Sequence, residues 1–255
     1  MEDIACSPAT TERETSTKHL FEDCAWLYAF CREHLFRDHT KEISQALFPQ
    51  GAPLKSMSVL EVGCGPGFYA RRLARRYPAL HVLGIDRSSR LLAWARSRAS
   101  SDQLGNCRFQ QGDVETISAS VDAVDAVISS RLLLIVENRS TVLAEIFQVL
   151  KPGGRLFLIE PTANHKTQFP LAAMRLAMRF IRSTGRETSP NRVNVLSPSE
   201  FQDLVQSQPW AKVSIQMYGD YQCAVCDKGD DMSTDFQALG ACTNSVAVDG
   251  SRSVA

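Results

Sequence analysis

The sequence predicts an α/β fold built on a doubly wound, mostly parallel sheet of seven strands. Short apolar runs typical of buried strands alternate with amphipathic helical stretches, a pattern that indicates a parallel sheet covered on both faces. A glycine-rich turn follows the first of these runs, and an aspartate follows each of the next two. At 255 residues, the chain is long enough for one such domain with a full core.

The first core strand is predicted from Met57 to Val62, and a helical pattern runs from Tyr69 to Tyr77. Between them lie three glycines spaced two apart: Gly63, Gly65 and Gly67. A strand, a glycine turn and a helix are typical of the opening of a nucleotide-binding unit. Glycine is needed there because a side chain would hold a ligand away from the backbone and because the turn requires unusual dihedral angles. The helix carries four arginines that we expect on a solvated face: Arg71, Arg72, Arg75 and Arg76.

The second strand, residues 81–85, ends at Asp86, 19 residues after Gly67. An acid about 20 residues beyond the glycines is the usual partner of a ribose diol, because a carboxylate can accept both hydroxyl protons. Arg87, next in the chain, is a further candidate contact. The third strand, residues 107–111, leads into Gly112-Asp113-Val114-Glu115.

The fourth strand, residues 121–130, has Ser129, Ser130 and Arg131 at its carboxyl end, where open α/β sheets bind ligands. An amphipathic helix (residues 140–150) and a fifth strand (residues 155–159) follow. A capping box begins a helix at Ser197. The last two strands are then predicted at residues 213–217 and 221–226.

The run from Glu61 to Gly67 resembles the first motif of class I S-adenosylmethionine-dependent methyltransferases, and Leu150 to Pro161 is similar to the passage into their fifth strand. The resemblance implies a Rossmann-like sheet with an antiparallel last strand, S-adenosyl-L-methionine as cofactor, and methyl transfer to a small molecule. In this family the glycine loop lies under the methionine and ribose, and the aspartate of the Gly-Asp step accepts the adenine amine. The implied cofactor-binding residues are Glu61, Gly63, Cys64, Gly65, Gly67, Asp86, Arg87, Asp113, Val114 and Ser129.

The predicted methyltransferase domain spans residues 18–228, with a helical cap at 18–50 and a lid insertion at 161–195. For the helical stretch at 170–183, a plain packing helix and a membrane-surface helix remain alternatives to a lid. Residues 1–17 and 229–255 are predicted to be disordered tails because they are polar and lack periodicity. No apolar run reaches the ~20 residues needed to span a bilayer. The start of the chain does not resemble a signal peptide, so we expect a cytoplasmic protein with reduced cysteines.

Basic and acidic residues balance at 28 each, which argues against nucleic acid as the partner. DNA and RNA amino-methyltransferases resemble one another in an Asn/Asp-Pro-Pro-Tyr/Phe run at this strand end. This chain has Ser-Ser-Arg-Leu at 129–132 instead, which counts against methylation of a nucleic-acid base. A small-molecule acceptor is therefore expected, whereas its identity and the oligomeric state stay open.

The sequence contains no clear catalytic base. His165 is the candidate, and His34 and His39 rank below it. From the cap, Tyr28 and Arg32 are expected to be within reach of the cofactor's carboxylate or the substrate. Glu160 with Asn164 is a poor metal pattern, and Cys223 and Cys226 fall on opposite faces of a strand, so no metal is predicted. Two alternatives remain: a non-catalytic cofactor-binding module, and a nicotinamide-dependent oxidoreductase, suggested by the Gly-x-Gly-x-x-Ala run that ends at Ala70.

Overall fold

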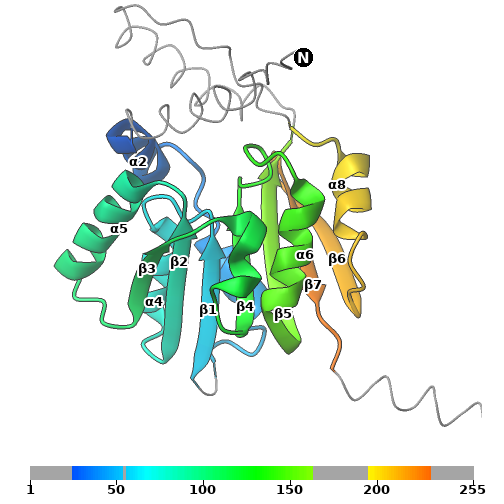
Figure 1. Cartoon of the computed structure of the whole chain (residues 1–255), viewed down its shortest axis with the longest axis horizontal. Coiled ribbons are helices and arrows are strands. Elements are labelled where there is room, and N and C mark those ends of the chain that lie inside the picture. Colours follow the sequence, from blue (N-terminus) through cyan, green and yellow to red (C-terminus); the bar gives the residue numbers. More distant parts are fainter. Residues whose placement is uncertain (1–24, 54–55, 163–194, 231–255) are drawn as a thin grey trace, which may run out of the picture.

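The computed structural model describes residues 25–53, 56–162 and 195–230. Seven strands form one sheet in the order β3-β2-β1-β4-β5-β7-β6 (Figure 1). The first five pair in parallel, whereas β7 lies between β5 and β6 and is antiparallel to both. This confirms the predicted Rossmann-like sheet. The strands are β1 (Met57–Val62), β2 (Leu80–Asp86), β3 (Cys107–Gln111), β4 (Val124–Ser130), β5 (Leu150–Pro161), β6 (Lys212–Tyr218) and β7 (Tyr221–Asp227).

Helices cover both faces of the sheet, as the alternating pattern predicts. One apolar core lies between the sheet and α3, α4 and α5, and a second lies between the sheet and η1, α6 and α8. Figure 1 shows α6 on the near face and α4 on the far face. The helices are α2 (Ala25–His34), α3 (Thr40–Leu47), α4 (Phe68–Arg76), α5 (Ser89–Ser101), η1 (Val114–Ala119), α6 (Arg139–Val149) and α8 (Pro198–Val205).

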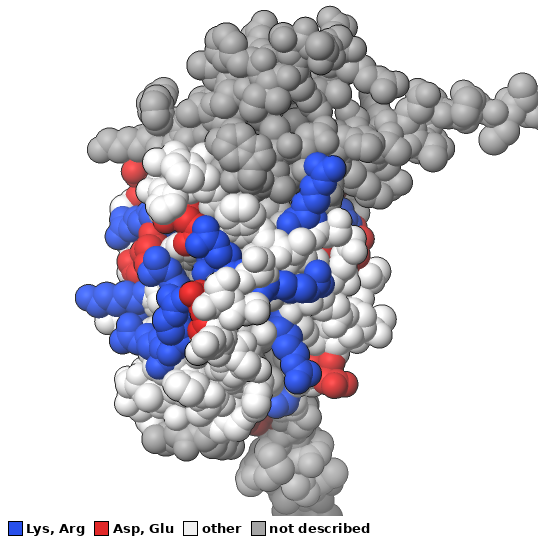
Figure 2. Space-filling view, turned by 90° about the vertical axis from the view of Figure 1, so that its left-hand side faces the viewer, with Lys and Arg blue, Asp and Glu red and all other residues white. Residues whose placement is uncertain are grey.

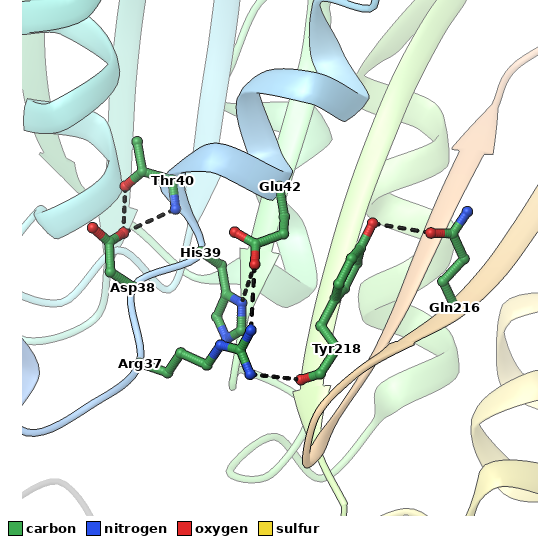
Figure 3. Close-up of polar contacts among 7 residues, drawn as sticks. All are labelled: Arg37, Asp38, His39, Thr40, Glu42, Gln216 and Tyr218. Atoms are coloured by element: carbon green, nitrogen blue, oxygen red, sulfur yellow. Dashed lines mark hydrogen bonds and ion pairs between the residues drawn. The ribbon is translucent and has the colours of Figure 1, made fainter.

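The described part of the N-terminal helical stretch consists of two helices, α2 and α3, with a break between them. Between α2 and α3, the Asp38 carboxylate accepts hydrogen bonds from the Thr40 N–H at 2.9 Å and the Thr40 hydroxyl at 2.5 Å (Figure 3). Such a local side-chain bond competes with helical backbone bonding. Arg37 then donates to the Tyr218 carbonyl at 3.3 Å, which attaches this break to the β6–β7 hairpin.

The arginines of α4 do not all lie on a solvated face, so that prediction is wrong for Arg71. Arg71 is 7% exposed and pairs with Glu33 of α2 and Asp102 at the end of α5. By contrast, Arg72 is exposed and pairs with Asp38 at 2.8 Å. The buried arginine therefore ties the N-terminal helix to the core of the domain.

The helix start predicted at Ser197 is confirmed, because the capping box that joins Ser197 and Glu200 begins α8. The Ser88 hydroxyl accepts a hydrogen bond from the Leu91 N–H at 3.2 Å and caps α5. Each of the strands β1, β2, β3 and β4 is followed at its carboxyl end by a turn that glycine or local hydrogen bonds fix. The candidate site is built from these turns.

Candidate functional site

The glycine loop joins β1 to α4 and takes a conformation that favours glycine. Gly63, Gly65 and Gly67 have φ angles of 64°, 52° and 70°, in the left-handed region that side chains other than glycine rarely enter. A Cβ at Gly67 would lie 2.5 Å from the Phe109 ring, and one at Gly65 would lie 3.2 Å from Tyr28 Cε1. The loop is therefore held closely between the core on one side and α2 on the other.

Asp86, at the carboxyl end of β2, is bonded directly to this loop. The Gly65 N–H donates to Asp86 Oδ2 at 2.7 Å, and the Ser88 N–H donates to Asp86 Oδ1 at 2.9 Å. The structure thus brings together Asp86 and the glycine loop, two of the three sequence motifs. The carboxylate has a fixed orientation because both of its oxygens accept backbone N–H groups.

Glu61, on β1, lies beneath the loop and caps α4 from inside. It is 4% exposed, and its Oε2 accepts the Ala70 N–H at 2.7 Å. Burial raises the pKa of Glu61 to about 7, although the Ala70 bond and the charge of Arg32 oppose this shift. A carboxylate at a helix N-terminus is favoured by the helix dipole, so the group has a structural role in the loop.

The third motif lies at the next strand end. Strand β3 pairs with β2 so that Gln111 stands opposite Asp86, and the Gly112 N–H donates to the Asp86 carbonyl at 3.1 Å. Asp113 then caps η1 through the Glu115 N–H at 2.9 Å. Asp86 and Asp113 therefore occupy neighbouring strand ends at the same edge of the sheet.

Arg87 and Val114 flank this pair of aspartates. Arg87 Nη2 lies 2.6 Å from each carboxylate oxygen of Asp113, and both side chains are partly exposed. The Val114 side chain is buried at the start of η1. Arg87 thus contacts the aspartate of the third motif rather than Asp86, next to it in the chain.

The remaining predicted site residues are Cys64 and Ser129. The Cys64 thiol is buried beneath the loop, against Gly84 of β2, and burial raises its pKa well above the ordinary value. Ser129 stands opposite Val62 in the β1–β4 pairing. Its hydroxyl is fully buried and has no hydrogen-bond partner in the described part of the chain, so it is a free polar group beside the loop.

Sequence reasoning left three neighbouring residues out of the cofactor set. Tyr28 reaches the loop from α2, and Arg32, one turn later, stacks on Phe68 with its Cζ 3.8 Å from the ring centroid. Arg131 follows β4 with a φ of 58°. Its position at a strand end was visible in the sequence, but its left-handed backbone and its proximity to α2 are tertiary features.

Two of the three candidate bases, His34 and His39, lie within the described residues, and their surroundings differ. His165 lies outside the described residues, and His34 packs on Phe30 at the end of α2. His39 is fully buried with its ring on Tyr221, and burial, together with the charges of nearby arginines, lowers its pKa to about 4. Figure 3 shows His39 turned toward Glu42, 3.8 Å away. His39 is therefore neutral near pH 7 and a weak base.

Glu160, at the end of β5, is a carboxyl group that the sequence pattern suggested only as a poor metal ligand. It is 1% exposed, and its Oε1 accepts the Leu133 N–H at 2.9 Å. Its Oε2 has no hydrogen-bond partner among the described residues. Burial raises the pKa of Glu160 to about 8, so this carboxyl group holds a proton near neutral pH.

Cys223 and Cys226 lie in the two different cores, on opposite faces of β7, as predicted. Within the described ranges, no group of three or more His, Cys, Asp or Glu side chains is placed to hold a metal ion. The described helices also include none whose length and apolar character would let it cross a bilayer.

The strand order and the glycine loop at the carboxyl end of β1 are those of the class I S-adenosylmethionine-dependent methyltransferases. The chain matches the family described as a methyltransferase domain over residues 53–208. It therefore belongs to this family. S-adenosyl-L-methionine is the cofactor of the class.

Individual relatives agree with this assignment. Trans-aconitate 2-methyltransferase of Deinococcus radiodurans is 37% identical over 121 residues, which cover 48% of this chain and 43% of that protein. The mitochondrial ubiquinone biosynthesis O-methyltransferase of Rattus norvegicus is 32% identical over 142 residues, which cover 54% of this chain and 38% of that protein. The chain thus spans less than half the length of these two relatives.

Among solved structures, magnesium protoporphyrin IX methyltransferase from Synechocystis, determined with bound S-adenosylhomocysteine, superimposes with a TM-score of 0.59. The match covers 85% of this chain and all of that chain at 14% identity. At this identity the likeness establishes the fold alone.

Proposed function

We propose that this protein transfers a methyl group from S-adenosyl-L-methionine to a small-molecule acceptor. The observation that carries the proposal is the hydrogen bond between the Gly65 N–H and Asp86. This bond joins the glycine loop and the acid that is expected to bind the ribose in one site. Asp113, at the neighbouring strand end, supplies a second carboxylate at the same edge of the sheet.

The chemistry of these residues fits the cofactor. In the proposed assignment, Asp86 accepts hydrogen bonds from the ribose hydroxyls. Asp113 and the Val114 N–H form hydrogen bonds with the edge of the adenine, and Arg87 lies beside them. The loop from Gly63 to Gly67, with Cys64 contributing backbone only, lies along the methionine and ribose, and Glu61 fixes the loop from below. The buried hydroxyl of Ser129 has no hydrogen-bond partner in the described part of the chain, and a polar ligand would satisfy it.

The cofactor supplies a sulfonium methyl group that already carries a good leaving group. The protein then has to hold the acceptor in line and exclude water, and positioning alone supplies a large share of such rate enhancements. A base is required only when the acceptor must lose a proton early. The absence of a side chain in the described ranges that is clearly suited to be a base is compatible with this chemistry.

We also propose that residues 18–50 act as a cap over the site. Tyr28 of α2 lies directly over Gly65, and Ala29 of the same helix packs against Leu91 of α5. The proposed lid at 161–195 falls almost entirely outside the described residues. The cap would close one side of the pocket and shield it from water.

A cytoplasmic location and a partner other than nucleic acid belong to the same proposal. Figure 2 shows many Lys and Arg side chains on one face, with Asp and Glu side chains among them. Several of these arginines have acidic partners, such as Arg72 with Asp38, so the face is less suited to a phosphate backbone. The five cysteines in the described ranges are buried and free, as expected in a reducing compartment.

The names of the relatives support a small-molecule acceptor, since one acts on trans-aconitate and the other in ubiquinone biosynthesis. The nicotinamide alternative has less support. A dinucleotide pyrophosphate needs free N–H groups at the start of the helix after the glycines, and the Ala70 N–H is already bonded to Glu61.

Isothermal titration with S-adenosylhomocysteine tests the proposal, with NADH as the comparison ligand. We expect heat of binding for S-adenosylhomocysteine at micromolar concentrations and none for NADH. The reverse result would favour the oxidoreductase. A second measurement follows the release of S-adenosylhomocysteine from the methyl donor with a panel of small-molecule acceptors. Binding without turnover on any of them would favour the non-catalytic module.

A further inference from the structure

Two arginine side chains lie near each other at the carboxyl end of the sheet, and neither is bonded to a carboxylate among the described residues. Arg32 is 4% exposed, and its Nη1 and Nη2 atoms have no hydrogen-bond partner within the described ranges. Arg131 has unbonded Nε and Nη1 atoms that are shielded from solvent. Burial and the nearby charge of Arg131 lower the pKa of Arg32. The two cations therefore repel each other in a site with little water.

Aromatic rings cover the planar faces of both guanidinium groups. Arg32 Cζ lies 3.8 Å from the ring centroid of Phe68 and 4.4 Å from that of Tyr69. Arg131 Cζ lies 4.7 Å from the ring centroid of Phe36. Stacking of this kind occupies the face of a guanidinium and leaves the N–H groups at its edge free for another partner. Such an edge fits a carboxylate in a bidentate manner.

The backbone at Arg131 is also unusual. Its φ of 58° places a side chain in the left-handed region, where residues other than glycine are uncommon. Its N–H donates to the Ile159 carbonyl at 3.0 Å and continues the β4–β5 pairing. Its side chain lies near Tyr69, Tyr28 and Tyr221, which raise the pKa of Arg131 although burial opposes them. A strained residue that the fold fixes in this way is commonly part of a binding or catalytic site.

The two buried acidic groups near these arginines, Glu61 and Glu160, are bonded to the backbone instead of to the guanidinium groups. Glu61 accepts the Ala70 N–H, and Glu160 Oε1 accepts the Leu133 N–H. Burial raises the pKa of Glu61 to about 7 and that of Glu160 to about 8. Neither carboxyl group is therefore a fixed counter-charge near neutral pH. A buried charge without a partner is costly, so an anionic ligand is the expected partner.

This inference rests on the proposed function, under which the cofactor brings a single carboxylate to the site. Arg32, on the cap beside Tyr28 and the glycine loop, is placed to receive that carboxylate. The second cation then needs an anion of its own. We propose that the methyl acceptor is a carboxylic acid and that its carboxylate binds the guanidinium of Arg131.

Binding measurements in the presence of saturating S-adenosylhomocysteine test this proposal. The probes are trans-aconitate, 4-hydroxybenzoate and octanoate, each compared with its neutral amide by ligand-observed NMR and titration calorimetry. We expect at least one acid to bind the wild-type protein about tenfold or more tightly than its amide. In Arg131→Gln that preference should disappear, while S-adenosylhomocysteine affinity should change by less than about threefold. Gln occupies the same left-handed backbone as Arg, so the strain is matched.

Two further variants sharpen the result. Arg131→Lys keeps the charge but not the planar fork and should retain part of the preference for acids. Arg108→Gln, on the exposed side of β3, should bind as the wild type does. Amides that bind as tightly as acids, acids that bind Arg131→Gln undiminished, or failure of every acid to bind while S-adenosylhomocysteine binds would each overturn the proposal. Failure of S-adenosylhomocysteine itself to bind would overturn the proposed function, and this inference with it.

Discussion

The carboxylate of Asp86 and the backbone N–H of Gly65 lie 2.7 Å apart, although 21 residues separate them in the chain. This bond joins the end of β2 to the turn after β1, so the same acid both orders the glycine loop and stands where a ribose diol is expected. The two roles can be separated by experiment, because one concerns the stability of the empty protein and the other its affinity for ligand.

Asp86→Asn should weaken S-adenosylhomocysteine binding by about 1–3 kcal/mol, or roughly 5- to 150-fold, because a charged acceptor of two hydroxyl groups is replaced by an amide. Titration calorimetry measures this loss directly. The matched control is Asp122→Asn, at an exposed position just before β4, which should leave affinity unchanged. Equal affinity of Asp86→Asn and wild type would remove Asp86 from the proposed site.

Gly67→Ala should destabilise the fold by about 2–4 kcal/mol, because the added Cβ meets the Phe109 ring in a left-handed backbone. Gly105→Ala is the control, since a Cβ there meets nothing within 4 Å, and it should change stability by less than about 1 kcal/mol. Urea unfolding measures both. Similar midpoints for the two variants would contradict the steric account of the loop.

Arg71→Met should lower the free energy of unfolding by about 2–4 kcal/mol, because it leaves Glu33 and Asp102 without the buried cation between them. Arg72→Met removes an exposed ion pair with Asp38 and should cost about 1 kcal/mol or less. Thermal or urea unfolding compares the two. If the exposed pair proved the more important, α2 would not be held by the buried arginine.

Glu61 makes the stability of the protein depend on pH in a predictable direction. Its pKa is about 7 in the folded state against an ordinary value of 4.5, with burial as the main cause. Between these values the folded state holds the proton and the unfolded chain has released it. The stability that this group contributes is thus fully present below about pH 4.5 and is lost as pH rises through about 7.

Glu61→Gln should reduce that fall in stability by an amount on the order of 1–3 kcal/mol, since an amide accepts the Ala70 N–H without titrating. Urea unfolding at about pH 5 and about pH 8 measures the difference. The control, Glu137→Gln, lies at an exposed position and should keep the full pH dependence of the wild type. An unchanged slope in Glu61→Gln would mean that Glu61 ionises normally in the folded protein.

The sequence by itself determined the mostly parallel sheet and the positions of the glycine loop, Asp86 and Asp113, whereas the antiparallel last strand followed from the resemblance to a known family. The glycine loop and the two aspartates are local features, because each lies in a turn directly after an apolar strand. The parallel pairing of β1, β2 and β3 then brings the carboxyl ends of these strands to one edge of the sheet. Spacing along the chain was sufficient because neighbouring strands in such folds are joined by short connections.

Only the tertiary structure decided which distant side chains join these turns. Arg32 and Arg131 are 99 residues apart in the chain. They become neighbours because α2, which carries Arg32, packs over the carboxyl end of the sheet, where Arg131 follows β4. The burial of Arg71 has the same origin, since α2 and the end of α5 enclose it. Periodicity reports the faces of one element, whereas these contacts depend on how separate elements pack, and local sequence patterns do not encode that packing.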